Sequence, residues 1–338
     1  MSEQVRIGIL GTARITGRAL LAPARMVPAV TVAGIAARDA ARASAFALQH
    51  GIADAFGSYE ELLASPSVDA VYVPLPNALH AHWTLRALAA GKHVLCEKPF
   101  ASNAAEAREV VEAAASGGLV VMEAMHYRYH PLVARMAALI GSGAIGAVTH
   151  AQAWTNWAIG DPDDIRYDYP LGGGALMDGG CYAIDCLRLV GEACGEVDPA
   201  VSGALADPMP DGRVDRSMAA RLAFPGGLTG WFESSFTREG EFRADVHVIG
   251  SQGHLRLRNF INAQAGRLAV TRDGAVVSAE DGADLPDGAD TTFTWQLRAF
   301  ASAVLEGTPF PTTAESAVVT MRLIDDGYHA AGMPVRGA

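Results

Sequence analysis

The chain is poor in features that mark several protein classes. It has only four cysteines, Cys96, Cys181, Cys186 and Cys194, and no pair of CxxC motifs. A paired-cysteine zinc site is therefore not expected, and the thiols are predicted to be free. No apolar run is long enough to cross a membrane. The GxSxG motif of a serine hydrolase is also missing, which disfavours that class of enzyme.

Positive charge is scarce as well. Lys and Arg number 26 against 37 Asp and Glu, giving a formal net charge of −11. A nucleic-acid surface needs clustered cations, so no nucleic-acid partner is expected. The first residues, Met1 to Arg6, lack the basic-then-apolar pattern of a signal peptide, and we expect a cytoplasmic protein without a membrane partner.

The length of 338 residues, half of them hydrophobic, predicts two domains. Residues 1–124 alternate short apolar runs with helical segments, which predicts an α/β Rossmann-type, doubly wound parallel sheet. Residues 125–338 are expected to form an α/β substrate-binding domain. From Val148 onward, alternating segments there predict a large, open, mainly antiparallel sheet. Its C-terminal helices can pack back on the first domain.

The first strand-to-helix turn is a candidate phosphate site. Backbone N–H groups and the positive end of a helix bind phosphate at such a turn. The turn keeps only Gly11 of the GxGxxG fingerprint, and taken alone it fits a plain tight turn better than a phosphate site. Arg38 ends the second apolar run, where an arginine accommodates the 2′-phosphate of NADP; an ordinary surface cation is the alternative. Asp39 fits a helix N-cap better than a ribose ligand.

A second candidate element is the strand end at Glu97 and Lys98. Ligands bind beyond the carboxyl ends of parallel strands, and Pro99 restricts the backbone of Lys98 to extended conformations. A half-buried lysine there can exchange protons near neutral pH, whereas a solvated lysine is the alternative. Asn77 and His80 follow the neighbouring strand and could hold the nicotinamide ribose, with helix capping as the other interpretation of Asn77. The candidate cofactor-binding residues are Gly11, Thr12, Ala13, Arg14, Ile15, Arg38, Pro74, Leu75, Asn77, His80, Glu97 and Lys98.

The glycine-rich stretch from Leu171 to Arg188 is a third candidate. Helical spacing from Ala175 to Val190 would place Asp178 and Tyr182 on one face. A carboxylate beside a phenol can orient the phenol and tune its acidity, which suits proton transfer. An amphipathic helix with one polar stripe is the alternative. No histidine joins these carboxylates, so no metal site is expected.

With these stretches in hand, the sequence resembles the family named for glucose-fructose oxidoreductase, inositol dehydrogenase and MocA. The matching segments include Gly8 to Gly11, Ala37 to Asp39, Gly91 to Pro99, Gly172 to Asp178 and the final helices from Trp295 to Ala330. The resemblance implies a Rossmann-type domain, then an α/β domain whose open sheet often forms a dimer face. It also implies hydride transfer between NAD(P) and a sugar, cyclic polyol or related carbonyl, in a homodimer or dimer of dimers.

The resemblance further implies roles for single residues. Lys98 matches the lysine that binds the reacting hydroxyl, and Asp178 matches an active-site aspartate. Tyr182 replaces the histidine of the inositol dehydrogenase branch and resembles the acid/base tyrosine of a branch that mostly uses NADP. The expected catalytic residues are Lys98, Tyr182 and Asp178, and the expected substrate-binding residues are Lys98, Arg128, Trp157, Asp178 and Tyr182. Two rivals are a non-catalytic NAD(P) sensor and an enzyme using the cofactor transiently for elimination or glycoside cleavage.

Overall fold

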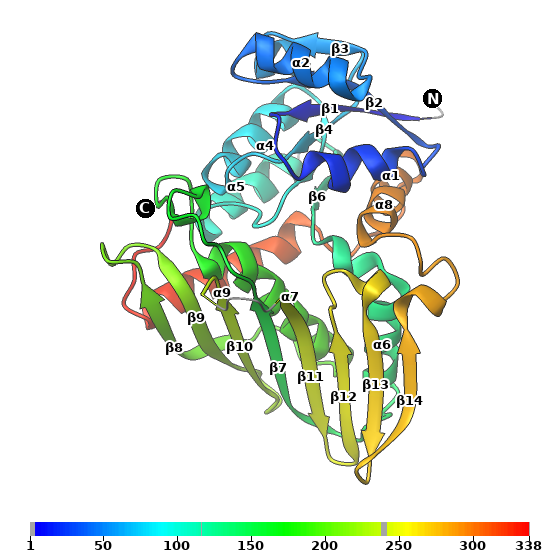
Figure 1. The fold of residues 1–338 in the computed structure, drawn as a ribbon, viewed down its shortest axis with the longest axis vertical. Helices are drawn as coiled ribbons and strands as arrows, with labels where there is room; N and C mark the ends of the chain where they lie inside the picture. The colour runs from blue at the N-terminus through cyan, green and yellow to red at the C-terminus, as the bar shows by residue number, and fades with distance from the viewer. Residues whose placement is uncertain (1–3, 116, 238–241, 338) are drawn as a thin grey trace. The chain divides into compact units, whose positions relative to one another are not determined.

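The computed structural model describes residues 4–115, 117–237 and 242–337, and the chain divides into two compact units (Figure 1). The first unit comprises Met1–His126 and Phe293–Val318, and the second comprises Tyr127–Thr292 and Val319–Ala338. The sequence predicts a boundary between residues 124 and 125, with C-terminal helices that can pack back on the first domain. The structure groups Phe293–Val318 with the first unit.

The first unit is built on a parallel sheet of six strands in the order β3-β2-β1-β4-β5-β6. This order reverses direction between β1 and β4, which is the point where dinucleotide-binding sheets hold their ligand. The central strands are continuous apolar runs because helical connections cover them. The strands are β1 (Val5–Leu10), β2 (Val30–Ala36), β3 (Asp54–Phe56), β4 (Ala70–Val73), β5 (His93–Cys96) and β6 (Val121–Glu123).

Side-chain caps fix where several crossover helices begin. Asp39 accepts from the backbone N–H groups of the first turn of α2, which confirms the predicted cap, and Ser58 caps α3. Asn103 accepts from the N–H of Glu106, whose side chain accepts from the N–H of Ser102, a capping box. The helices of this unit include η1 (Gly17–Leu21), α1 (Ala22–Ala24), α2 (Ala40–His50), α3 (Tyr59–Ala64), η2 (Asn77–Leu79), α4 (His80–Ala89) and α5 (Ala104–Ala115).

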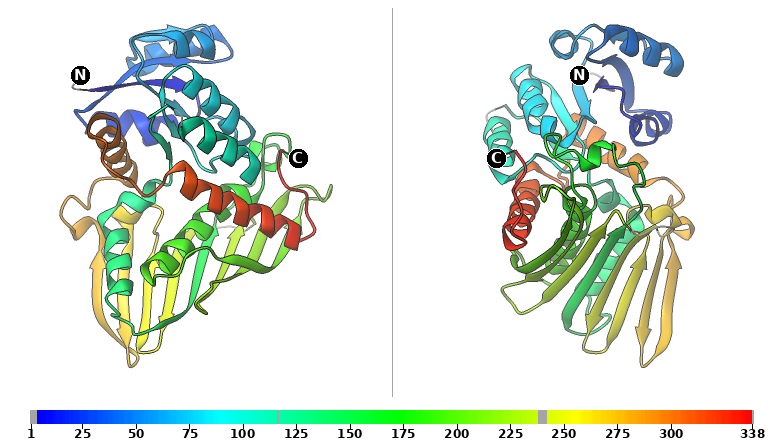
Figure 2. Two further views of the ribbon diagram at one scale, coloured as in Figure 1. Left: turned by 180° about the vertical axis from the view of Figure 1, so that it is seen from behind. Right: turned by 60° about the vertical axis from the view of Figure 1, so that its left-hand side comes forward.

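The second unit contains an open sheet of eight strands in the order β14-β13-β12-β11-β7-β10-β9-β8 (Figure 2). Only β7 and β10 pair in parallel, and the other neighbours are antiparallel. The strands are β7 (Val148–Asn156), β8 (Ala200–Pro208), β9 (Asp215–Ala223), β10 (Thr229–Ser235), β11 (Arg243–Gly250), β12 (Gly253–Arg258), β13 (Arg267–Arg272) and β14 (Ala275–Asp281). The predicted open, mainly antiparallel sheet is thus confirmed.

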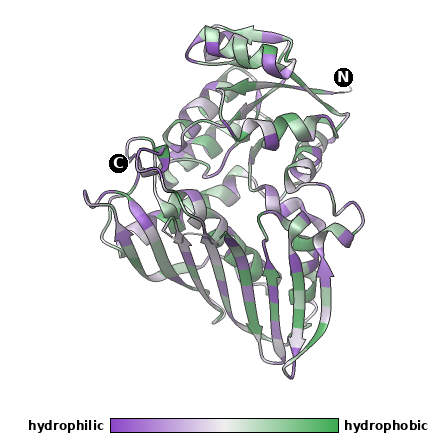
Figure 3. Cartoon of the chain, viewed as in Figure 1, coloured by the Kyte–Doolittle hydropathy of each residue, from purple (hydrophilic) through white to green (hydrophobic). Residues whose placement is uncertain are grey.

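One face of this sheet is covered by helices. Residues alternate between buried and more exposed along much of β7 and β10, and Figure 3 shows hydrophobic and hydrophilic residues interleaved along the strands of this sheet. Helix α7 packs on β7 and β10, and α6 packs on α7, so the core lies between these helices and the sheet. The helices between the two segments of the first unit are η3 (His126–Tyr129), α6 (Pro131–Gly141), η4 (Ile165–Tyr167), η5 (Leu176–Gly180), α7 (Cys181–Ala193), η6 (Ala263–Ala265) and η7 (Gly282–Asp284). Helix α8 (Thr292–Glu306) belongs almost entirely to the first unit, and α9 (Ala314–Ala330) is divided between the two units at Val318.

Two sequence expectations need adjustment. The helix expected continuously from Ala175 to Val190 is a π-helix, η5, followed by the α-helix α7. The amphipathic stretch from Ser102 to Ser116, which the sequence predicts as a helix, forms α5 from Ala104 to Ala115, and position 116 lies outside the described residues. Within the described part of the chain, none of the helices has the length and apolar character needed to cross a membrane.

Candidate active site

The turn after β1 has the backbone form of a phosphate-binding loop. Gly11 has a φ of +95°, and a Cβ there would come within 3.0 Å of Leu75 and 3.5 Å of the Tyr59 hydroxyl. No side chain fits, so the backbone stays open to close approach, as the fingerprint's first glycine requires. Thr16 stands where the third glycine would be and is completely buried. The turn leads into η1, and π-helical turns are frequent at functional sites.

Two arginines lie at the tip of β2. Arg38 and Arg42 are both exposed, and Arg42 donates to the hydroxyl of Thr12 in the glycine turn over 3.0 Å. Burial raises the pKa of Tyr59, while the positive charges of Arg38 and Arg42 act in the opposite direction. The charges of both guanidinium groups are therefore felt at the Tyr59 hydroxyl, which lies beside Gly11. The sequence had identified Arg38 but not Arg42, which lies one helical turn further along α2.

His80 has a different place from the one expected. It is 1% exposed, with Nδ1 at 2.7 Å from the carbonyl oxygen of Pro99 and Nε2 at 2.8 Å from that of Leu75. Burial lowers the pKa of His80 to about 4. Both ring nitrogens face backbone carbonyls, so the side chain lies between two loops, and its contact with a cofactor stays a prediction. Asn77 begins η2 and is not the cap of that helix, which is Pro76.

Lys98 stands at the carboxyl end of β5, half-buried. The neighbouring Glu97 is buried and accepts a hydrogen bond of 2.7 Å from the phenol of Tyr72. Burial raises the pKa of Glu97, whereas the Tyr72 hydrogen bond and the Lys98 charge oppose that rise. The Lys98 charge also lowers the pKa of His80 and of His126, after the larger effect of burial. Lys98 thus lies among buried titratable groups at the ligand-binding edge of the sheet.

Arg18 and Phe293 complete this edge of the first unit. The guanidinium carbon of Arg18 lies 5.8 Å from the ring centre of Phe293, and the ring of His126 stacks against the same phenyl at 3.8 Å. The Arg18 charge contributes to the pKa of both Glu97 and His126. No motif in the sequence connects these residues, because Phe293 is distant along the chain and joins the unit only through folding.

In the second unit, Asp178 lies within η5 and is paired with Arg166. Asp178 Oδ2 is 2.8 Å from Arg166 Nε, and Arg166 Nη1 is 3.0 Å from Asp164 Oδ1. Asp178 raises the pKa of Arg166 more than Asp164 does. Sequence reasoning missed Arg166, although its loop, residues 159–170, is rich in Asp and aromatic residues.

Tyr182 lies in the first turn of α7 and is 5% exposed. Its ring makes an edge-on contact with that of Tyr127, with 6.0 Å between centroids. Tyr127 donates a 2.5 Å hydrogen bond to Asp185, and burial, with the Asp185 charge next, raises the pKa of Tyr127 well above its ordinary value. Tyr127 therefore stays a neutral donor, and Asp185, three residues after Tyr182 in α7, orients the Tyr127 phenol.

Arg128, expected to bind substrate, belongs to a buried network. Its side chain is 5% exposed, with Nη2 at 2.8 Å from Glu192 and Nε at 3.9 Å from Asp185. The side chain is mostly buried and paired with two acidic residues of α7, and its contact with substrate stays a prediction. The sequence could have indicated this pairing, because Asp185 and Glu192 lie two helical turns apart on one face of α7 and form an acidic pair.

Trp157 belongs to an aromatic group beside η5. It stacks on Phe242 at 6.2 Å with 19° between the planes, and contacts Phe236 at 6.3 Å. A Cβ on Gly179 would lie 3.0 Å from its indole ring, so Trp157 packs on the residue next to Asp178. An aromatic face beside a carboxylate suits the apolar and polar faces of a sugar.

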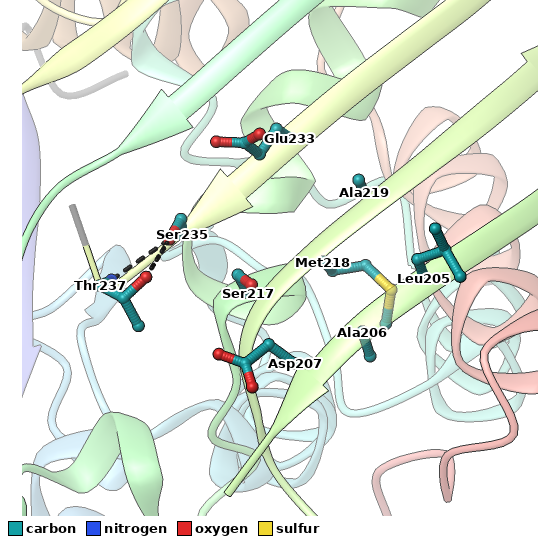
Figure 4. Close-up of a pocket in the computed structure, with 9 residues that line it drawn as sticks. All are labelled: Leu205, Ala206, Asp207, Ser217, Met218, Ala219, Glu233, Ser235 and Thr237. Atoms are coloured by element: carbon teal, nitrogen blue, oxygen red, sulfur yellow. Dashed lines mark hydrogen bonds between the residues drawn. The ribbon is translucent and has the colours of Figure 1, made fainter.

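A separate pocket of about 270 Å³ opens on β8, β9 and β10 (Figure 4). Its lining includes Leu205, Asp207, Glu233 and Ser235. Ser234 points the other way, since its hydroxyl donates to the carbonyl of Ala175 before η5. Successive strand residues face opposite sides, so the pocket lies on the face of the sheet opposite η5 and is not part of the Asp178 cluster.

Comparisons with known proteins agree on one family. The model of the oxidoreductase family Gfo/Idh/MocA, NAD-binding Rossmann fold, matches residues 5–125, and the model of that family's C-terminal domain matches residues 133–256. A D-xylose 1-dehydrogenase (NADP(+)) of Haloferax volcanii is 40% identical over 96% of both chains. A trans-1,2-dihydrobenzene-1,2-diol dehydrogenase of Sus scrofa is 37% identical over 66% of this chain and 64% of its own.

Solved structures extend the likeness. The 3-ketoreductase KijD10 of Actinomadura kijaniata, in complex with NADP and TDP-benzene, superposes with a TM-score of 0.84 at 31% identity, covering 97% of this chain and 98% of its own. An aldose-aldose oxidoreductase of Caulobacter crescentus, complexed with glycerol, gives 0.87 at 25% identity with the same coverage. Structures of KijD10 include variants in which a lysine or a tyrosine is replaced, at the sequence separation that Lys98 and Tyr182 have here.

Proposed function

Because the chain belongs to the Gfo/Idh/MocA oxidoreductase family, we propose that it transfers a hydride between NADP(H) and a hydroxyl or carbonyl carbon of a sugar, cyclic polyol or related small carbonyl compound. The observation that carries the proposal is the place of Lys98. It is a half-buried cation at the carboxyl end of β5, next to the point where the strand order reverses. That edge is where such sheets hold a dinucleotide.

The choice of NADP rests on charge at the tip of β2. Arg38 and Arg42 are exposed there, Arg42 reaches the turn of Gly11 through Thr12, and Asp39 is occupied as the cap of α2. Two cations and no free carboxylate favour the 2′-phosphate of NADP over the bare ribose of NAD. The remaining cofactor contacts proposed from the sequence are backbone and side-chain contacts of the loops after β1, β4 and β5.

The proposed catalytic roles belong to three side chains. When bound, the nicotinamide supplies the carbon that accepts or donates the hydride. Lys98 binds the reacting oxygen and stabilises its negative charge, and Tyr182 removes or returns the hydroxyl proton. Asp178 accepts a hydrogen bond from a neighbouring substrate hydroxyl, and Trp157 covers an apolar face of the sugar. Proton transfer of this kind contributes about 10² to 10⁴ in rate, and positioning supplies much of the rest.

The test is a turnover assay with product analysis. The purified chain is mixed with NADP or NAD and a panel of aldoses, cyclic polyols and aromatic trans-dihydrodiols, and the absorbance of reduced nicotinamide is followed. We expect reduction of NADP by at least one member of the panel, with NAD less effective. Conversion of sugar without net nicotinamide change would indicate transient cofactor use. Tight NADP binding with no product from any compound would favour a sensor and overturn the proposal.

A homodimer or dimer of dimers is proposed through the open face of the second sheet. That face carries Trp154 and Trp231, with ring centroids 5.6 Å apart, and Arg243 over Trp154 at 3.8 Å. Leu205 on the same sheet is 80% exposed. Aromatic and Arg side chains are enriched at protein interfaces. Light scattering coupled to size exclusion measures the mass directly; the cytoplasmic location stays a prediction.

A further inference from the structure

Arg166 contacts one of the proposed catalytic residues although no motif marks it. It lies in η4, in the loop between β7 and η5. Its Nε donates to Asp178 Oδ2 over 2.8 Å, and its Nη1 donates to Asp164 Oδ1 over 3.0 Å. One guanidinium therefore joins two carboxylates, one from its own loop and one from the candidate site.

The main chain fixes this guanidinium relative to Asp178. The N–H of Gly174 donates to the carbonyl of Arg166 over 2.8 Å, and the N–H of Asp178 donates to the carbonyl of Gly174 over 3.0 Å. The Arg166–Asp178 ion pair closes this set of contacts into a ring. A Cβ on Gly173 would lie 2.5 Å from the carbonyl oxygen of Arg166, so the loop packs on the glycine turn at a distance that only glycine allows.

The loop end of the ring is held as well. The backbone N–H of Arg166 donates to Asp164 Oδ1 over 3.0 Å, so Asp164 binds both the main chain and the side chain of the arginine. The Asp178 side chain is 15% exposed and that of Asp164 14%, whereas that of Arg166 is 37% exposed. The Asp178 carboxylate is mostly enclosed, so loss of its partner should affect it strongly. Because solvent reaches the Arg166 side chain, a substrate can approach the ion pair.

We infer that Arg166 is a positioning residue that holds the carboxylate of Asp178 ionised and in one orientation for a substrate hydroxyl, with Asp164 anchoring the guanidinium. The inference rests on the proposed function, in which Asp178 contacts the sugar. A carboxylate fixed by a charged hydrogen bond on one oxygen offers its other oxygen in a defined direction, which supports selection of a hydroxyl by its geometry.

The experiment compares four variants with the wild type. Arg166→Met removes the charge and keeps much of the side-chain volume, Arg166→Lys restores the charge without the planar geometry, and Asp164→Asn weakens the anchor. Arg267→Met is the matched control. Arg267 also pairs with an aspartate, at 2.6 Å from Asp281, but this ion pair joins β13 and β14 at one edge of the eight-stranded sheet. Two readouts are used: kcat, KM and their pH dependence with NADP and the accepted sugar, and carbon-13 NMR titration of the Asp178 carboxyl, assigned with Asp178→Asn.

We expect Arg166→Met to raise the KM for sugar about tenfold or more, to leave the KM for NADP unchanged, and to move the acid limb of kcat/KM and the NMR midpoint of Asp178 upward by about one pH unit. Arg166→Lys should restore the acid limb but not the KM. Asp164→Asn should fall between the wild type and Arg166→Met, and Arg267→Met should match the wild type.

An unchanged acid limb and unchanged NMR midpoint in Arg166→Met would overturn the inference, whatever its thermal stability. If the wild type turns over none of the panel, the proposed function is wrong. The inference about Arg166 is then decided by the NMR titration midpoint of the Asp178 carboxyl in the wild type and in Arg166→Met. A loss of activity in Arg166→Met with unshifted midpoints would show a general structural role and would overturn it too.

Discussion

The Nδ1 atom of His80 lies 2.7 Å from the carbonyl oxygen of Pro99, which ties the start of α4 to the turn that presents Lys98. Nε2 makes the second contact, at 2.8 Å from the carbonyl of Leu75. A neutral imidazole carries one N–H, so His80 donates a hydrogen bond to one of these carbonyls and only contacts the other, and the ring lies between the loops that follow β4 and β5. His80 therefore supports the ligand-binding edge of the sheet. Its substitution should lower the stability of the fold and also displace Lys98.

The pH dependence of stability follows from the low pKa of His80. Its folded value of about 4 lies below the ordinary 6.5 because the ring is buried. Between these values the unfolded chain binds more protons, so this contribution is complete above pH 6.5 and is lost as the pH falls toward 4. A difference of this size corresponds to about 3 kcal/mol. Urea unfolding of His80→Gln at pH 7 and pH 5 should therefore show a shallower pH slope than the wild type, although the variant is less stable at pH 7. Equal slopes would contradict the prediction.

Replacement of Arg42 should change the choice of cofactor. Arg42→Ala removes one of two exposed cations at the tip of β2 and its hydrogen bond to Thr12. A charged hydrogen bond to phosphate contributes about 1.5 to 3 kcal/mol, so we expect the Kd for NADP to rise roughly tenfold or more while the Kd for NAD changes little. Fluorescence titration with both reduced cofactors measures this. Arg108→Ala, on α5, is the control, and a parallel loss of NAD binding would indicate a structural effect.

The predictable part of the molecule is the part that depends on local pattern. Continuous apolar runs indicated the central strands of the first sheet, and Asp39 marked a helix start, because these signals act over a few residues. Edge strands such as β8 and β14 were missed, since their residues are mostly partly or fully exposed and carry no buried alternation. The helix expected over Asp178 and Tyr182 assumed 3.6 residues per turn, and periodicity does not reveal the π-helical turn there.

The missed site residues share a different cause. Arg166 and Phe293 each acquire their role from a partner in another segment, Asp178 and the ring of His126, and the contact of His80 with Pro99 likewise depends on folding. Such pairings depend on how loops pack, as at Gly173, where the close approach of the Arg166 carbonyl decides the contact. A single sequence shows the residue types but not these tertiary distances.

The C-terminal arginine should be important for stability. Arg336 is completely buried, pairs with the buried Asp215 over 2.9 Å and donates to the carbonyl of Gly173 over 2.7 Å. Arg336→Met leaves the carboxylate without its counter-charge, which typically costs about 3 to 5 kcal/mol. Arg213→Met, which removes an exposed guanidinium over Tyr169, should cost less than about 1 kcal/mol. Denaturant unfolding compares the two, and equal losses would contradict the buried role.

Crowding at Gly174 makes a sharper test of the same region. Its φ is +139°, and a Cβ would lie 2.3 Å from Asp215 Oδ1 and 2.6 Å from the Tyr328 hydroxyl. Gly174→Ala should therefore displace the start of η5 and lower both stability and kcat/KM. Gly143→Ala, at a φ of +72° but with open space around its Cβ, separates backbone strain from crowding. Stability losses of the same size in both variants would mean that crowding contributes little.

Removal of the Tyr182 phenol should separate chemistry from binding. Tyr182→Phe keeps the ring and its edge-on contact with Tyr127, so NADP binding should be retained while kcat falls by about 10² to 10⁴. If Lys98 and Tyr182 serve one proton transfer, the double variant Lys98→Met/Tyr182→Phe should be little slower than the worse single variant. Tyr169→Phe, whose hydroxyl bonds the carbonyl of Val335, is a phenol control expected to keep kcat within about threefold, because its hydroxyl serves packing. Full activity of Tyr182→Phe would remove the phenol from the mechanism, and strictly multiplicative losses in the double variant would show that the amine and the phenol act in different steps.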